Sequence, residues 1–152
     1  MLENQARAGV AQWWSPSLLS FVALLPLSGV LAHAAEPSRP EPPFVLPVAA
    51  DGVQRGSVIL DSYSFQPANL IVEAGKPVEL TLTSVTTIVP HNFIIKDPAG
   101  ALSVQQDVGS GKTVVVKFTP TQPGTFPIYC DKRLWPLPSH RDKGMEGKLE
   151  VR

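Results

Sequence analysis

The chain has 152 residues, and 13 lysine and arginine residues balance 13 aspartate and glutamate residues, so the formal net charge is zero. The cations do not cluster into a basic stripe, which argues against a nucleic acid as the partner. A neutral chain also lacks the strong long-range field that steers charged partners.

The first 35 residues are typical of an export signal. A single cation, Arg7, precedes an apolar run over residues 18–31, and Ala-His-Ala at residues 32–34 is a small-x-small cleavage site. The run contains a proline and is shorter than the ~20 apolar residues of a membrane-spanning helix, which favours a cleaved signal over an uncleaved anchor. We therefore expect a signal peptide over residues 1–35, a periplasmic or otherwise exported protein, and no stable membrane span after cleavage.

The next stretch, residues 36–55, opens with EPSRPEPPFVLPVAA, which contains five prolines and little periodic pattern. This composition is typical of an extended linker. We expect a proline-rich linker over residues 36–55 and one domain over residues 56–152, because a chain of this size supports a single hydrophobic core.

From residue 56 onward, short β-rich runs alternate with turn residues, and no run keeps a 3.6-residue period long enough to predict a helix. The alternation is clearest where Val78, Leu80 and Leu82 share one face. We expect about eight strands, over residues 57–62, 69–73, 78–83, 91–96, 102–106, 113–118, 125–130 and 147–151. This count and the spacing of the turns predict an all-β fold, a Greek-key sandwich or barrel.

The side chains that bind soft metals are few. Beyond the leader the chain has one cysteine, Cys130, one methionine, Met145, and two histidines, His91 and His140. One thiolate, two imidazoles and one thioether are the ligand set of a mononuclear copper site for electron transfer. A lone cysteine in an exported protein cannot form an internal disulfide, so a metal ligand is one of its few roles. The set therefore predicts a copper site.

Strand periodicity places part of this set. A period of two puts Phe126, Ile128 and Cys130 on one strand face, and His91 begins a neighbouring strand. Ligands held by two strands impose their geometry on the metal. Asn92 is placed to steady the adjoining ligand loop.

Each residue also has a plainer interpretation. Cys130 alone would be an inert core residue, and Met145 alone would fill core space. His91 alone would be as readily a satisfied surface histidine as a metal ligand. Their combination favours metal ligation.

The chain resembles the cupredoxins, the small blue copper proteins of the plastocyanin and azurin kind. The resemblance covers roughly residues 56–152, through FQPANLIVEAGKPVELTLTS, the PHNF segment, PGTFPIYC and SHRDKGMEGKLEV. It implies a cupredoxin-like Greek-key β-sandwich or barrel of about 7–8 strands that binds one type 1 copper. It further implies that His91, Cys130 and His140 are the equatorial ligands, that Met145 is the weak axial ligand, and that the electron passes through a partly exposed His140.

One spacing departs from that family pattern. Nine residues separate Cys130 from His140, far more than in the simple electron carriers, and this is more similar to the electron-accepting site of copper nitrite reductases. Those enzymes and the multicopper oxidases need further histidines for additional copper. Because only His91 and His140 follow the leader, we expect no enzyme.

The long spacing also raises the role of residues 131–139. Trp135, with Leu134 and Leu137, either packs over the copper as a shield or forms an apolar docking patch for a redox partner. We expect shielding, because tryptophan is usually packed rather than displayed. The surrounding charged residues are expected to be a solvated rim.

The leading hypothesis is a monomeric exported protein that carries single electrons between redox partner proteins, which the sequence does not identify. The alternative is copper handling, meaning storage, delivery or tolerance, without a dedicated electron-transfer role. A third interpretation is a structural zinc module that uses Cys130, His91 and His140.

Overall fold

The computed structural model describes residues 41–100 and 102–152. The predicted signal peptide and the first residues of the predicted linker lie outside the described residues. The described residues belong to one compact unit. Among them, no helix combines the length and apolar character needed to cross a membrane.

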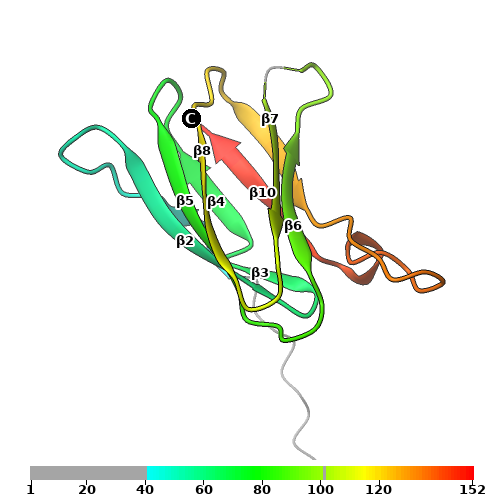
Figure 1. Ribbon diagram of the computed structural model, residues 1–152. Coiled ribbons are helices and arrows are strands. Elements are labelled where there is room, and N and C mark those ends of the chain that lie inside the picture. Colours follow the sequence, from blue (N-terminus) through cyan, green and yellow to red (C-terminus); the bar gives the residue numbers. More distant parts are fainter. Residues whose placement is uncertain (1–40, 101) are drawn as a thin grey trace, which may run out of the picture. The chain divides into compact units, whose positions relative to one another are not determined.

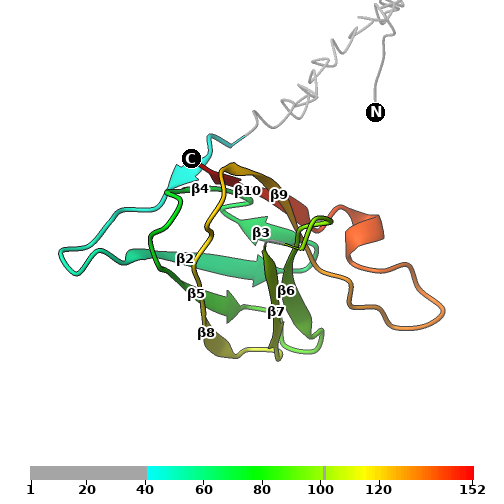
Figure 2. The same ribbon diagram turned by 90° about the horizontal axis from the view of Figure 1, so that it is seen from above.

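The described residues form ten strands in two sheets (Figures 1 and 2). The six-stranded sheet has the order β1 (Phe44–Val45), β4 (Asn69–Val72), β10 (Glu146–Val151), β9 (Gly124–Tyr129), β6 (His91–Lys96) and β7 (Ser103–Val108). The four-stranded sheet has the order β3 (Ser64–Gln66), β2 (Gln54–Asp61), β5 (Val78–Ser84) and β8 (Thr113–Phe118). The chain passes repeatedly from one sheet to the other, so the predicted all-β Greek-key sandwich is confirmed.

The core lies between the two sheets. Val78, Leu80 and Leu82 of β5 are at most 1 % exposed, and Glu79 and Thr81 between them are half-buried, as the alternating pattern predicts. Phe126 and Ile128 of β9 belong to the same core. These residues supply the hydrophobic burial that holds β5 and β9 in place.

Two short strands were not predicted from the sequence. β3 follows the turn after β2, and β1 lies within the stretch expected to be a linker. Next to β1, Leu46 is 2 % exposed and packs in the core. Strands of two or three residues are too short to show a period, and they form because a longer strand beside them satisfies their backbone.

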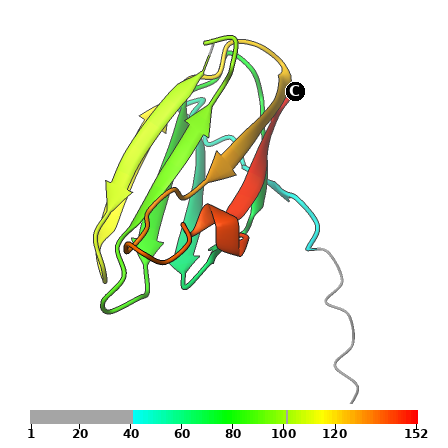
Figure 3. The same ribbon diagram turned by 90° about the vertical axis from the view of Figure 1, so that its right-hand side faces the viewer.

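The segment between β9 and β10 lies at the end of the sandwich opposite the C-terminal end of β10 (Figure 3). It contains a single turn of 3-10 helix, η1 (Arg141–Lys143). Gly144 ends this turn with a φ of 93°, a left-handed conformation that favours glycine. The turn brings the chain back to β10 immediately after His140.

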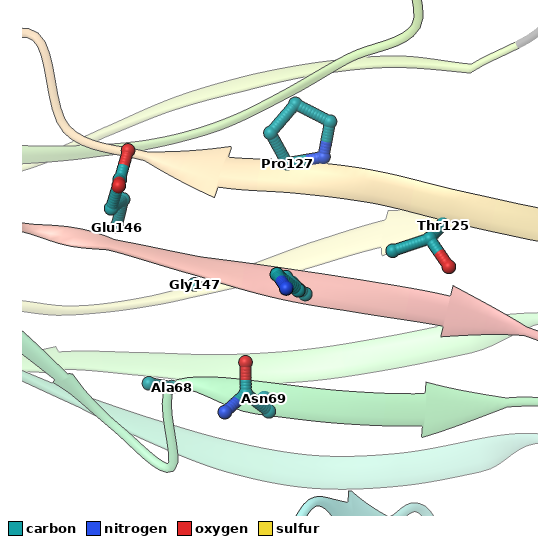
Figure 4. Close-up of a pocket in the computed structure, with 7 residues that line it drawn as sticks. Ala68, Asn69, Thr125, Pro127, Glu146 and Gly147 are labelled. Carbon is teal, nitrogen blue, oxygen red and sulfur yellow. The ribbon is translucent and has the colours of Figure 1, made fainter.

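β10 also approaches its neighbour β4 very closely. A Cβ atom on Gly147 would overlap the carbonyl oxygen of Ala68, which accepts a hydrogen bond from the backbone N–H of Lys148 at 3.1 Å. The missing side chain helps to form a groove of about 460 Å³ beside Asn69 and Thr125 (Figure 4). The glycine therefore keeps the start of β10, and Met145 before it, in register.

Candidate metal centre

Two of the predicted ligands are held by neighbouring strands. His91 is the first residue of β6, and Cys130 directly follows β9. β6 and β9 pair antiparallel, with Ile95 opposite Ile128. Both predicted ligands are 0 % exposed, as expected for side chains on the inner face.

Backbone hydrogen bonds bring the other two predicted ligands to the same place. The N–H of His140 donates to the carbonyl oxygen of Lys132 at 2.8 Å, and the N–H of Met145 donates to that of His140 at 2.9 Å. The N–H of Cys130 in turn donates to the carbonyl oxygen of Met145 at 3.1 Å. His140 and Met145 are therefore fixed to Cys130 by main-chain contacts alone.

The donor atoms of His91, Cys130 and His140 all lie within 4.8 Å of one another. The Cys130 Sγ atom is 3.3 Å from the Nδ1 atom of His140, and the two imidazole ring centroids are 5.0 Å apart. His140 is 5 % exposed, and Met145 is 0 % exposed beside this cluster. The structure thus brings three predicted donors together and places the fourth residue alongside them.

The hydrogen bonds of His91 show which ring nitrogen is available. Its Nε2 atom lies 3.1 Å from the hydroxyl of Thr86, and that hydroxyl donates its proton to the carbonyl oxygen of Val89 at 2.7 Å. The hydroxyl has only one proton, so toward His91 it accepts, and this network assigns the ring proton to Nε2. The Nδ1 atom is buried and has no hydrogen-bond partner. A buried nitrogen with a lone pair and no partner is what a metal ligand requires.

Burial keeps both imidazoles neutral. Burial, followed by the nearby His140, lowers the pKa of His91 from its usual 6.5 to about 4, although Asp61 opposes the change. Burial, followed by the charge of Lys143, also lowers the pKa of His140. Neutral imidazoles are the form that binds metals, so the site needs little proton release from its histidines.

The thiol has the opposite tendency. Burial raises the pKa of Cys130, although the backbone N–H groups of Asn92 and Lys132 act against it. The Asn92 N–H lies 3.4 Å from Sγ. A buried thiolate therefore needs a cation beside it, which a bound metal would supply.

Asn92 also joins the two strands through its side chain. Its amide nitrogen donates to Asp131 Oδ1 at 2.7 Å, and its amide oxygen accepts from the Asp131 N–H at 3.1 Å. Asn92 is 2 % exposed. Asn92 therefore ties β6 to the residue that follows Cys130, in agreement with its predicted position.

The residues after Asp131 behave differently. The side chains of Leu134 and Trp135 are 75 % and 82 % exposed, and Leu137 is 52 % exposed. The expectation that Trp135 shields the metal is therefore wrong. The backbone hydrogen bond between His140 and Lys132 closes the base of the loop, so the intervening residues project outward (Figures 1 and 2).

Sequence reasoning missed two side chains that contact the histidines. Thr86 accepts from His91, and Tyr63, in the turn between β2 and β3, packs its ring edge-on against His140 at 5.3 Å between centroids. The ammonium of Lys143 lies 4.9 Å from the centre of the Tyr63 ring. Neither Thr86 nor Tyr63 belongs to a sequence motif. Only the fold brings the segments that carry them close to the two histidines.

The donor set fits a borderline or soft metal ion. Two neutral imidazoles and a thiolate suit copper and also zinc, whereas a buried thioether nearby suits copper better. Among the described residues, this cluster contains no carboxylate, which argues against a hard cation.

Comparison with known proteins agrees with this geometry. A family model described as the Cupredoxin-like domain matches residues 22–149. Plastocyanin from Ulva prolifera is 34 % identical over 98 residues, a match that spans 59 % of this chain and 88 % of that plastocyanin.

Two solved structures show the same fold. The metal binding domain of the Cu(I)-exporting P-type ATPase CopA of Streptococcus pneumoniae D39, solved with Cu(I), has a TM-score of 0.56 at 19 % identity, over 73 % of this chain and 96 % of that domain. Auracyanin B has a TM-score of 0.50 at 20 % identity, over 64 % of this chain and 88 % of its own. With the match to the family model and to plastocyanin, these findings confirm the predicted resemblance: the chain belongs to the cupredoxin-like family.

Proposed function

We propose that this protein is an exported type 1 copper protein that carries single electrons between redox partner proteins. In this proposal His91, Cys130, His140 and Met145 hold one copper ion. The observation that carries it is the convergence of three buried donors within 4.8 Å, with the Nδ1 atom of His91 left without a partner. Membership of the cupredoxin-like family supports the copper that the resemblance implies.

When bound, copper alternates between Cu(I) and Cu(II) and so supplies one electron in each cycle. The residues around it provide rigidity. His91 and Cys130 are fixed by paired strands, and His140 and Met145 by backbone hydrogen bonds, so the donors move little when the charge changes. Small displacement of ligands lowers the reorganisation that accompanies electron transfer.

The burial of the site favours a carrier over an enzyme. His91 and Cys130 are 0 % exposed and His140 is 5 % exposed, so an electron reaches the cluster more readily than a substrate does. Among the described residues, His91, Cys130 and His140 form the one group of histidine, cysteine or acidic side chains arranged to hold a metal. Such a chain relays an electron rather than performing chemistry at a second centre.

The direct test is to add Cu(II) to the purified protein and record its visible and paramagnetic resonance spectra. We expect an intense thiolate-to-copper charge-transfer band. Cys130→Ser should abolish the band, whereas Met145→Leu should keep the colour and shift the reduction potential. A wild-type protein that binds copper without this band, or that is purified with stoichiometric zinc, would contradict the proposal.

Export is tested separately. The predicted cleavage site places the first residue of the mature protein near Ala35. N-terminal sequencing of protein from the exported fraction should find that start. Recovery of only the uncleaved chain would contradict export without affecting the metal site.

A further inference from the structure

The loop that separates Cys130 from His140 is closed at its base. The N–H of His140 donates to the carbonyl oxygen of Lys132 at 2.8 Å, and the ammonium of Lys132 pairs with Asp107 of β7 at 2.8 Å. Ser139 is fixed at the other side by two hydrogen bonds from its N–H and hydroxyl to Asp142, at 3.0 Å and 2.7 Å. We call residues 133–139 the arm. Its two ends are joined independently of its tip.

The tip of the arm is apolar and exposed. Trp135 is 82 % exposed and Leu134 is 75 % exposed, and Leu137 turns back so that its N–H donates to Leu134 at 2.7 Å. Ile88, in the connection between β5 and β6, is 85 % exposed. Large apolar side chains gathered in this way mark interaction surfaces. The exposed side chains are not needed to position His140, because the backbone hydrogen bond to Lys132 already holds it.

The arm and the β5–β6 connection together line a groove of about 250 Å³. Ile88, Val89 and Pro90 line it from the connection, and Leu134 lines it from the arm. His140 also lines this groove, and it is the one proposed ligand that does so. The apolar groove therefore leads to the edge of the proposed metal site.

Both charged residues that line the groove are cations, Lys132 and Arg133. Lys132 is paired with Asp107, whereas Arg133 lies 3.7 Å from Asp142 and its side chain is 56 % exposed. A carboxylate on a partner can approach this guanidinium without displacing a short ion pair. The groove is thus complementary to an apolar protrusion bordered by acidic residues.

We infer that the arm and this groove bind a redox protein whose docking face is an apolar protrusion ringed by carboxylates. The inference rests on the proposed function and names the class of partner. A protein fits better than a lipid surface, because the groove is concave and ends at His140, where an electron can be passed on. In the encounter one electron leaves the reduced partner and converts Cu(II) to Cu(I), and no atom or proton is transferred.

The test compares two triple variants. The arm variant carries Leu134→Ser, Trp135→Ser and Leu137→Ser, and the control carries Val45→Ser, Val48→Ser and Val115→Ser, which replace exposed apolar residues that do not line the groove. Stopped-flow mixing with a reduced cytochrome whose haem edge is ringed by carboxylates gives the second-order rate constant. We expect it to fall roughly tenfold in the arm variant and to stay unchanged in the control, because exposed aromatic anchors dominate such contacts.

The charge part of the inference has its own variant. Arg133→Gln should lower the rate with the acidic cytochrome severalfold at low ionic strength and leave it unchanged at high ionic strength. A basic cytochrome, with lysines around its haem edge, should react more slowly than the acidic one with the wild-type protein. A faster reaction with the basic cytochrome would overturn the assignment of an acidic partner.

A binding measurement separates docking from electron transfer. In copper-free protein, titration with the oxidised acidic cytochrome should shift the indole N–H resonance of Trp135, assigned with Trp135→Phe, while amides near Val115 stay in place. The absence of any shift, or equal rate constants for the arm variant and the wild type with both charge-transfer bands intact, would overturn the inference.

Loss of binding to phosphatidylglycerol vesicles in the arm variant, with no change in cytochrome rate, would assign the arm to a membrane instead. A missing charge-transfer band in the wild type refutes the proposed function and leaves this titration to decide docking.

Discussion

β9 and the arm are apolar segments only three residues apart in the chain, yet they differ completely in environment. Phe126 and Ile128 of β9 are 8 % and 1 % exposed, whereas Leu134 and Trp135 of the arm are 75 % and 82 % exposed. The strand is buried because β6 and β10 satisfy its backbone on both sides. The backbone of the arm pairs with no strand, so its side chains have no sheet to pack against. Apolar character places a residue in the core only where the backbone is also paired.

The largest loss of stability should come from shortening a buried side chain of β9. Ile128→Ala should lower the free energy of unfolding by about 3 kcal/mol, because it leaves a cavity in the core between the two sheets, where Ile128 is buried. Urea unfolding, followed by circular dichroism, measures the change. Val115→Ala on β8, where the side chain is 47 % exposed, is the matched control and should cost far less. Equal losses for the two variants would refute the description of the core.

The hydrogen bonds between Asn92 and Asp131 should contribute less to stability than Ile128 does. Asn92→Ala removes both side-chain hydrogen bonds to Asp131 and should cost about 2 kcal/mol in unfolding free energy, about 1 kcal/mol for each lost hydrogen bond. Asp131→Asn keeps the oxygen that accepts from Asn92 and should cost less. If Asn92→Ala lowered the unfolding free energy no more than a surface substitution does, the hydrogen bonds between Asn92 and Asp131 would have no structural importance.

The turn before Met145 should respond more mildly. Gly144→Ala places a Cβ in open space, so its cost is the left-handed backbone alone, about 1 kcal/mol. Gly52→Ala has the same strain, at a φ of 79°, and similarly open surroundings far along the chain. Both should lose similar stability in thermal unfolding, but only Gly144→Ala should shift the charge-transfer band. A shift with Gly52→Ala would show that the site responds to general destabilisation.

The arm should contribute least to folding. Trp135→Ser should change the unfolding free energy by no more than about 0.5 kcal/mol, because an exposed side chain loses little packing. Differential scanning calorimetry of this variant beside Ile128→Ala gives the sharpest form of the comparison. A large loss with Trp135→Ser would mean that the arm packs against the protein in solution.

The sequence predicted those parts of the molecule that depend on local periodicity. The alternation at Val78, Leu80 and Leu82 predicted an inward face, and the same reasoning placed Cys130 at the inner end of its strand. The scarcity of cysteine, histidine and methionine then selected the residues that the fold brings together. Membership of the family agrees with that selection, while the ligand assignment itself remains a proposal.

Features that depend on distant partners could not be predicted. Trp135 was expected to be packed, but its position follows from the hydrogen bond between His140 and Lys132 and from the pairing of Lys132 with Asp107, 25 positions earlier in the chain. The proton on His91 depends on Thr86 for a similar reason. Sequence composition describes what a loop contains, whereas its direction is decided by where its ends are bonded.

The closed base of the arm also has a practical meaning. Because the chain is already tied together between Lys132 and His140, the residues at the tip can be exchanged as a cassette without disturbing the donors on either side. Under the proposed function, mutations at the tip would change which partner the protein binds and leave the metal site unchanged. The same tolerance makes the tip a natural position for grafting a recognition peptide.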